Sequence, residues 1–312
     1  MKTLLLIGGT GFLGQSFLDY INDGKLKKIK LSKIIIISRK KKKFNSKIKI
    51  NYIQNSISKI KKIPKTDYII YAANSSNISE NLKGVKNFIN LLNNNHKKTK
   101  ILFTSSGAVY GPRNILKKFK EIDQINHKNI RSFSSYKKEY SKVKIIIEKE
   151  FKNLGKQGYN VSIARLFSFI GKRILKNKNN AGSDYAITNL INQGKDKNSS
   201  IIKVNDNYDI YRGYMNSEDL IKWLIKILVN SNNKCNIYNV GSDEAITIKK
   251  LAIIISKIFR KSVQIKNKKK NKKSIDYYVP SIAKAKRVLN LRLKYTIIQS
   301  IYQLLNVKSN KN

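Results

Sequence analysis

The first fourteen residues carry the hydrophobic pattern that organises the chain. A strand-forming run from Thr3 to Ile7 ends abruptly in glycines, and apolar residues then recur at helical spacing from Phe12 to Leu18. This pattern predicts a buried strand, a tight glycine turn and a helix. Gly8, Gly11 and Gly14 stand three residues apart, where glycine lets a ligand approach the backbone and lets helix pack closely on strand. The amides of the helix's first turn favour an anion such as a pyrophosphate, so a dinucleotide site is expected.

Strand-like and helix-like segments alternate along the rest of the first half. Short apolar runs predict strands at 33–37, 48–53, 67–74, 101–103 and 161–167. Apolar positions at helical spacing predict helices over 82–92 and 140–154. Alternation at this pitch predicts an α/β fold with a Rossmann-type, doubly wound parallel sheet.

The end of the second predicted strand bears on the choice of dinucleotide. An acid there hydrogen-bonds the 2′-OH of the adenosine ribose, whereas a cation accommodates a 2′-phosphate. Here the strand is followed by Ser38, Arg39 and Lys40, with no acid. We therefore expect NADP to be favoured over NAD, with Ser38 and Arg39 beside the ribose. Because cations are abundant throughout the chain, the missing acid counts for more than the presence of Arg39.

Composition changes this picture little, although the formal net charge is +47. The chain has 56 lysines and nine arginines, and the lysines are spread along its whole length, with runs at 40–43 and 268–273. Nucleic-acid sites usually gather charge on one face and use arginine and aromatic stacking. The abundance of Lys, Asn and Ile is typical of drift in an AT-rich genome, so we expect no specific nucleic-acid partner.

Cysteine content and hydropathy bear on the compartment. A single cysteine, Cys235, rules out a disulfide framework and fits a reducing environment. No apolar run approaches membrane-spanning length, and the opening LLLI is too short for a signal peptide. We expect a cytoplasmic protein without a membrane partner. No His, Cys, Asp and Glu residues have metal-ligand spacing, so no metal site is expected.

Tyr140 and Lys144 give a second chemical signal. On a helix their spacing places both on one face, with Glu148 one turn further on. A neighbouring ammonium lowers the pKa of a phenol, which makes the tyrosine a usable acid or base. With 17 tyrosines and 56 lysines in 312 residues, chance supplies about three such pairs. Position carries the argument instead, because the pair follows a strand that ends in hydroxyl groups at 104–106.

Several segments together carry a resemblance to a known family. They are GGTGFLG, DYIIYAA, TSSGAVYG, the Tyr140 and Lys144 pair, and ARLFSFIG. The chain resembles an extended short-chain dehydrogenase/reductase, and it is similar to the NAD-dependent epimerase/dehydratase family, which acts on nucleotide sugars. The resemblance continues through YRGYMNSEDL, YNVGS and DYYVP and spans nearly the whole chain. These motifs are specific for the superfamily and much less so for any one reaction.

The resemblance implies a cofactor site for NAD(P) and a catalytic set. Ser106 would hydrogen-bond the reacting oxygen, Tyr140 would transfer the proton, and Lys144 would hold the nicotinamide ribose and lower the pKa of Tyr140. Tyr136 is the competing tyrosine, but it has Tyr140 rather than a lysine four residues on. The cofactor residues implied are Gly8, Gly11 and Gly14 at the pyrophosphate, Phe12 and Leu13 through their amides, Asn55 at the adenine amino group, Ala72 and Ala73 under the ribose, and Tyr140 and Lys144.

The resemblance also implies a domain division and a substrate site. Residues 1–167 would form the NAD(P)-binding Rossmann domain, and 168–312 would be mainly a smaller α/β substrate domain, with about 210–242 returning to the first. Ser105, Ser106, Asn189 and Arg212 would bind the substrate, Arg212 at its diphosphate. The family commonly forms homodimers through the helix bearing the tyrosine, and the apolar face of 140–154 would suit that contact.

These expectations converge on an enzyme with a nucleotide-sugar substrate, but they leave alternatives open. We expect an epimerase or a ketoreductase that transfers a hydride at a sugar ring carbon. Ser106 is followed by Gly107 and Ala108, where dehydratases of the family carry an Asp-Glu pair, which disfavours a dehydratase. A non-catalytic member of the fold that binds RNA or senses redox state is the remaining alternative. The retained Ser106, Tyr140 and Lys144 argue against it, and the net charge argues for it.

Overall fold

A seven-stranded parallel sheet is the centre of the computed structural model, with the strands in the order β11-β6-β5-β4-β1-β2-β3. The structure describes residues 2–26, 29–44, 46–125, 130, 134–171, 185–205, 209–266 and 275–307. The lysine run at 268–273 lies outside these ranges. The strands are β1 (Lys2–Ile7), β2 (Leu31–Ser38), β3 (Lys49–Gln54), β4 (Tyr68–Tyr71), β5 (Lys100–Ser106), β6 (Asn160–Leu166) and β11 (Asn236–Val240).

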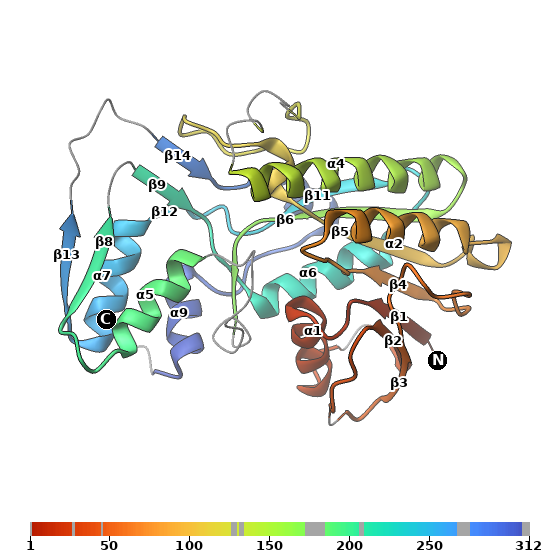
Figure 1. The fold of residues 1–312 in the computed structure, drawn as a ribbon, viewed down its shortest axis with the longest axis horizontal. Coiled ribbons are helices and arrows are strands. Elements are labelled where there is room, and N and C mark those ends of the chain that lie inside the picture. The colour runs from red at the N-terminus through yellow and green to blue at the C-terminus, as the bar shows by residue number, and fades with distance from the viewer. Residues whose placement is uncertain are drawn as a thin grey trace.

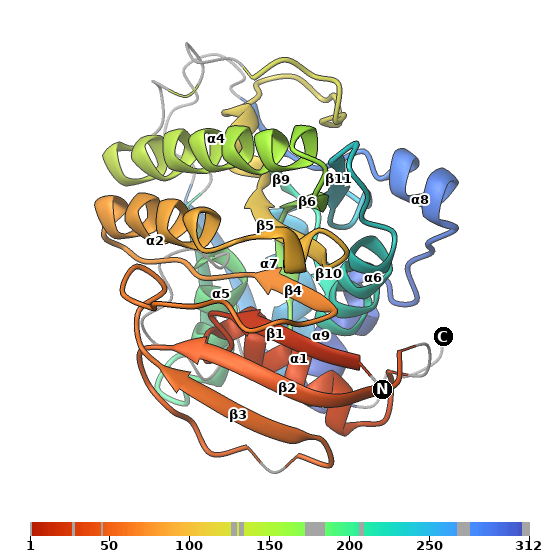
Figure 2. The same ribbon diagram turned by 90° about the vertical axis from the view of Figure 1, so that its right-hand side faces the viewer.

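Helices cover both faces of this sheet, as Figure 2 shows. One face packs on α1 (Phe12–Asn22) and α6 (Ser217–Val229), and the other packs on α2 (Ile78–Asn90) and α4 (Ser135–Lys156). The strand β1 serves both layers, with Leu4 and Leu6 in one core and Leu5 and Ile7 in the other. Burial on both faces explains why this strand is apolar throughout instead of alternating. The predicted Rossmann-type fold is confirmed.

The order of the strands reverses beside β1. The chain runs outward from β1 through β2 to β3, and then returns to place β4, β5 and β6 on the other side. The carboxyl ends of β1 and β4 therefore border a topological switch point, where ligands bind in open α/β sheets. The predicted strand at 67–74 ends earlier, at Tyr71, so Ala72 and Ala73 lie in the loop at this point.

The second half of the chain builds a smaller unit beside the sheet, at the left of Figure 1. Its hydrophobic core is built from the helices α5, α7 and α9 and the strands β8 and β12. The strand β12 pairs with β9, and the short strands β7 and β10 pair with each other where the chain passes into this unit. The bounds are α5 (Tyr185–Lys195), α7 (Ile248–Phe259), α9 (Ile297–Leu305), β7 (Phe169–Ile170), β8 (Ile201–Asn205), β9 (Asp209–Arg212), β10 (Met215–Asn216), β12 (Ile246–Thr247), β13 (Ser262–Lys266) and β14 (Ile275–Tyr278).

Two later segments pack on the first unit instead. The helix α6 lies against the sheet and β11 forms its edge, which is where the returning segment at about 210–242 was expected. The helix α8 (Ala283–Leu289) also joins this core, through Ala285 and Leu289. Residues beyond 242 were expected mainly in the substrate unit, and α8 is a part of them that packs on the sheet unit. Two short 3-10 helices, η1 (Asn94–His96) and η2 (Gly107–Tyr110), flank β5.

The apolar face of α4 is already used inside the chain. Val143, Ile147, Phe151 and Leu154 are buried in the core that contains α2, and the Phe151 ring stacks on Phe103 with centroids 4.6 Å apart. Ile146 is the fifth apolar residue assigned to this face, and it is 47% exposed. The face proposed for a homodimer is therefore covered by the sheet and α2. A homodimer itself stays a prediction.

Two matched substitutions on α4 separate core packing from a subunit contact. Ile147→Ala should lower the free energy of unfolding by about 2–5 kcal/mol, because it empties a buried site. Ile146→Ala should cost no more than about 1 kcal/mol, because this side chain is half-exposed. Urea unfolding followed by circular dichroism measures both. A large, concentration-dependent loss for Ile146→Ala would instead show that a second copy covers this position.

Candidate active site

The glycine turn after β1 is a tight contact that side chains would break. Gly8 adopts φ +89°, and a Cβ there would lie 2.7 Å from the backbone nitrogen of Ala73. A Cβ on Gly14 would lie 2.4 Å from the backbone of Gly9, so α1 packs directly on the turn. Gly11 is the N-cap residue of α1 and has no side chain to satisfy the first amides. These features build a cradle that fits the pyrophosphate of a dinucleotide.

A cavity of about 730 Å³ opens over the carboxyl ends of the strands at this turn. This volume lies in the range of ligand sites, roughly 300–1,000 Å³. Of the site residues expected from the sequence, those that line it are Gly8, Gly11, Phe12, Leu13, Ser38, Arg39, Asn55, Ala72, Ala73, Ser105, Ser106, Tyr140, Lys144 and Arg212. Gly14 supports the turn from beneath. Asn189 is exposed on α5, where it accepts a hydrogen bond from Gln193, and it does not line the cavity.

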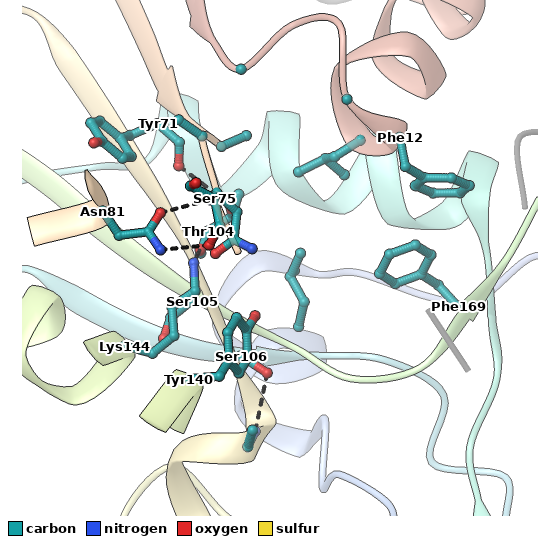
Figure 3. A pocket seen from close by; sticks show the side chains of 18 of the residues that line it. Phe12, Tyr71, Ser75, Asn81, Thr104, Ser105, Ser106, Tyr140, Lys144 and Phe169 are labelled. Carbon is teal, nitrogen blue, oxygen red and sulfur yellow. Dashed lines mark hydrogen bonds between the residues drawn. The ribbon is translucent and has the colours of Figure 1, made fainter. Parts of the chain in front are cut away.

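Ser106, Tyr140 and Lys144 come together at one end of the cavity (Figure 3). Ser106 closes β5, and its hydroxyl oxygen caps η2 by accepting from the amide of Ala108 at 3.1 Å. Ser106 also hydrogen-bonds the phenol of Tyr140. The Nζ atom of Lys144 donates to the carbonyl of Thr104 at 3.2 Å and lies 5.6 Å from the ring centroid of Tyr140.

Burial controls the protonation of this pair. It raises the pKa of Tyr140 to about 12, against the hydrogen bond from Ser106, which lowers it. It lowers the pKa of Lys144 to about 8, against the charge of Glu148, which raises it. The expected lowering of the pKa of Tyr140 by Lys144 is therefore not found. The physical reason is that desolvation disfavours both the phenolate and the ammonium, so each group moves toward its neutral form.

The competing tyrosine takes a different position. The side chain of Tyr136 is 41% exposed, and its ring stacks on Tyr140 with centroids 6.3 Å apart. It lines the outer part of the same cavity. Its ring thus contacts the tyrosine that Ser106 bonds, and four residues after Tyr136 stands Tyr140 instead of a lysine.

Ser105 does not present its hydroxyl as expected for a substrate contact. It is 3% exposed, and its hydroxyl donates to Glu148 Oε1 at 2.6 Å. Glu148 in turn pairs bidentately with Arg165, at 2.9 Å to Nε and 2.7 Å to Nη2. Burial alone would lower the pKa of Arg165, but the hydrogen bonds and the charge of Glu148 raise it above its ordinary value. The sequence showed Glu148 on the face of Lys144 but did not reveal this buried pair.

Arg212 is held at the other side of the cavity by a carboxylate. Its Nη2 pairs with Asp276 Oδ2 at 2.7 Å, and its Nη1 donates to the carbonyl of Tyr211 at 2.9 Å. The side chain is 13% exposed, and both partners of the ion pair line the cavity. Asp276 was not expected here, because 64 residues separate it from Arg212 and only the pairing of β9 with β14 brings them together.

The residue after Ser106 meets an aromatic wall. A Cβ on Gly107 would lie 2.6 Å from the Phe167 ring and 2.7 Å from the hydroxyl of Tyr278. The two rings contact each other, with centroids 4.7 Å apart, and both line the cavity. A side chain at this position would therefore displace the ring ends of Phe167 and Tyr278.

No three His, Cys, Asp or Glu side chains in the described ranges are grouped so that they could hold a metal ion. None of the helices that the structure describes is both long and apolar enough to cross a membrane.

Comparisons with solved structures show the same fold at low sequence identity. The dTDP-glucose 4,6-dehydratase of Bacillus anthracis in complex with NAD has a TM-score of 0.74 and 15% identity, over 98% of this chain and 96% of the other. The ADP-L-glycero-D-manno-heptose-6-epimerase of Helicobacter pylori has a TM-score of 0.73 and 17% identity, over 98% and 95%. The UDP-N-acetylglucosamine 4-epimerase of Bacillus cereus has a TM-score of 0.70 and 18% identity, over 100% and 98%.

Sequence comparisons identify the family. The bifunctional polymyxin resistance protein ArnA of Wigglesworthia glossinidia brevipalpis is 26% identical over 357 aligned positions. The alignment covers 100% of this chain but only 52% of that relative, so the chain spans about half its length. The family model "NAD dependent epimerase/dehydratase family" matches residues 4–241, which is well over half of the chain. The chain belongs to the NAD dependent epimerase/dehydratase family.

Proposed function

We propose that the chain is a nucleotide-sugar epimerase or ketoreductase that transfers a hydride at a sugar ring carbon with NAD(P). The observation that carries the proposal is the convergence of Ser106, Tyr140 and Lys144 on the cavity that the glycine turn also borders. A dinucleotide would be held by the turn at its pyrophosphate, by Ala72 and Ala73 along its middle, and by Lys144 at the nicotinamide ribose. When bound, a nicotinamide supplies a hydride acceptor or donor.

The chain's own residues would manage the proton. Ser106 orients the reacting oxygen toward Tyr140, whose phenol it already hydrogen-bonds. With a pKa of about 12, Tyr140 rests in the protonated state and is ready to donate to a carbonyl oxygen. In the oxidative direction it must first release this proton to solvent through the cavity, before it takes one from the sugar hydroxyl. A charged Lys144 beside the bound sugar would favour the phenolate during that step.

Arg212 is our candidate for the substrate diphosphate. A guanidinium offers a planar fork of donors that suits phosphate oxygens, and Asp276 fixes its orientation. Asn189 is no longer proposed for this contact, because it does not line the cavity. The three structural relatives described above are named for dTDP-, UDP- and ADP-linked sugars. Their names support a nucleotide-linked sugar as the substrate of this chain.

The packing at Gly107 supports epimerisation or reduction over dehydration. Loss of water from a sugar needs an additional acid and base beside the central hydroxyl. Phe167 and Tyr278 fill the space that a side chain at residue 107 would need, so no carboxylate fits there without moving them. The dehydratase remains the alternative reaction, since another acid could act from elsewhere on the cavity.

Tyr140→Phe should lower turnover by about 10²–10⁴, the usual contribution of general acid–base catalysis. The fold and dinucleotide affinity should stay unchanged, because only the hydroxyl is removed. Turnover is followed by mass spectrometry on nucleotide-activated hexoses with NAD(P). Epimerisation leaves the mass unchanged, and reduction of a keto-sugar adds two hydrogens.

Tyr136→Phe is the matched control and should keep most of the activity. If it abolishes turnover while Tyr140→Phe does not, the proposed proton carrier is wrong. A product lighter by one water would contradict the assignment of epimerase or ketoreductase.

Lys144→Met should change the pH dependence of stability. Burial lowers the pKa of Lys144 to about 8, so above this pH the unfolded chain keeps a proton that the folded chain has released. The lysine therefore destabilises the fold below pH 8, and this penalty fades as the pH rises toward 10. The measured quantity is the variant's free energy of unfolding minus that of wild type. This difference should be about 2 kcal/mol larger at pH 7 than at pH 10.

Urea titrations at the two pH values measure this difference. The lost hydrogen bond to Thr104 contributes the same offset at both and cancels. If the difference in free energy of unfolding between variant and wild type is the same at pH 7 and pH 10, Lys144 titrates at its ordinary pKa.

Arg39 is proposed to favour NADP. It is exposed at the edge of the cavity, directly after Ser38, whose hydroxyl is occupied by the carbonyl of Lys40 at 2.6 Å. NADPH should bind more tightly than NADH in calorimetric titrations at matched salt, and Arg39→Ala should shrink that preference. Lys40→Ala removes a neighbouring exposed cation and should have a smaller effect. Equal affinities at high salt would remove the proposed NADP preference.

A further inference from the structure

The loop that follows η2, residues 111–125, carries apolar side chains that do not pack in a core. Ile115, Leu116 and Ile122 are 53%, 60% and 86% exposed, and the last two are the most exposed large apolar side chains in the described ranges. Single exposed aliphatic residues are ordinary on a protein surface, but here three fall within a short stretch of one loop. We call these three residues the apolar tip. The loop is drawn in yellow at the top of Figure 1 and Figure 2, beyond α4.

Arg113 holds this loop in shape from within. Its Nη1 donates to the carbonyls of Lys117 and Lys118 at 2.9 and 3.0 Å, and its Nη2 pairs with Asp123 Oδ2 at 2.7 Å. The same guanidinium lies over the ring of Phe119, 3.9 Å from its centroid. Both halves of the loop that carry the apolar tip are therefore bound to one side chain.

Phe119 anchors the loop to the body of the protein. Its side chain is 1% exposed and packs in a core with Tyr110 and Phe167. Its backbone amide donates to the carbonyl of Val279 at 3.0 Å, and its carbonyl accepts from the amide of Ser281 at 2.7 Å. A loop fixed in this way cannot fold its apolar side chains back onto the protein without breaking these contacts. The apolar tip thus projects from a fixed base.

The surface around the apolar tip is positively charged. Lys117, Lys118 and Lys120 are exposed, and no ion pair among the described residues includes them. The two acids of the loop, Glu121 and Asp123, both accept hydrogen bonds from within the fold. Lysines attract anionic headgroups, and aliphatic side chains enter the boundary between headgroups and acyl chains. The charge and the apolar tip together are complementary to an anionic lipid surface.

We propose that this loop is a contact site for an anionic lipid bilayer, into whose surface the apolar tip inserts. A bilayer accepts a projecting tip of any shape, whereas a protein partner must offer a matching pocket. No membrane partner was expected from the sequence, because no apolar run is long enough to span a bilayer. A contact in the plane of the membrane surface needs no such run.

Flotation of the full chain with vesicles of phosphatidylcholine, with and without phosphatidylglycerol, tests this inference. At about 0.15 M salt, wild type should bind the anionic vesicles more tightly than the neutral ones. Leu116→Ser with Ile122→Ser should weaken binding by about 10-fold or more, because the inserted groups are lost. Val288→Ser with Ile298→Ser removes aliphatic groups that are 55% and 44% exposed on α8 and α9, and it should bind as wild type does.

Because the net charge is +47, diffuse attraction by the whole chain must be separated from attraction by the loop. Lys117→Gln with Lys118→Gln should weaken binding to the anionic vesicles by about 30-fold. Lys61→Gln with Lys62→Gln makes the same charge change at an exposed pair before β4 and should weaken it less than about threefold. Thermal melting checks that every variant is folded.

Insertion is read directly from a tryptophan in the apolar tip. The emission of Ile122→Trp should shift to shorter wavelength with anionic vesicles, and lipids brominated on their acyl chains should quench it. The natural Trp223 is fully buried, so wild type should show neither change.

Three results would overturn this inference: no binding of wild type to anionic vesicles, unweakened binding of the Leu116→Ser, Ile122→Ser variant, or no quenching of Ile122→Trp by brominated lipid. If light scattering without lipid shows that Leu116→Ser with Ile122→Ser converts a dimer to a monomer, the apolar tip belongs to a subunit contact instead. Dinucleotide affinity should be the same in all these variants, so the outcome does not depend on the proposed reaction.

Discussion

The structure depends on one close contact, where the glycine turn after β1 meets the start of the loop after β4. Gly8 lies against the backbone of Ala72 and Ala73, and Gly14 lies against Gly9, at distances that leave no room for a Cβ. This contact brings the first turn of α1 over the ends of the strands. Because the strand order reverses at the same place, the helix amides and the cavity coincide.

A buried ion pair supports the end of this cavity that holds Ser106, Tyr140 and Lys144. Glu148 and Arg165 are almost completely buried, and removing such charges from water costs several kcal/mol per ion. The cost is offset by bidentate geometry and by hydrogen bonds from Ser105 to Glu148 and from Arg165 to Tyr110. The network joins β5, α4 and β6, and Glu148 also acts on the charge of Lys144. A site residue is thus tuned by groups that do not line the cavity.

Local pairing matters more for the chemistry here than the net charge of +47. The chain has 18 acidic residues. Within the described ranges, the acids that line the cavity are Glu80 and Asp276. Glu80 is anchored by serines, and Asp276 is paired with Arg212. The electrostatic environment of the cavity is therefore set by these local partners and not by the many exposed lysines. Interactions between exposed charges are screened by salt over about 10 Å.

The sequence by itself determined most of the elements of the sheet unit and which three residues meet at one end of the cavity. Apolar runs bounded by glycine predicted the sheet. Strand ends and helical spacing are local properties, and they singled out Ser106, Tyr140 and Lys144, which the structure places on one cavity. Burial, long-range pairing and exposure were decided only by the tertiary structure. The apolar face of α4 was assigned to a second copy, although the sheet covers it. Three features depend on contacts between residues 22 or more positions apart: the hydrogen bond of Ser106 to Tyr140, the carboxylate partners of Ser105 and Arg212, and the approach of Glu80 to the loop after β3. Such contacts cannot be read from neighbouring residues in the sequence, because the packing of the whole sheet and its helices brings those side chains together.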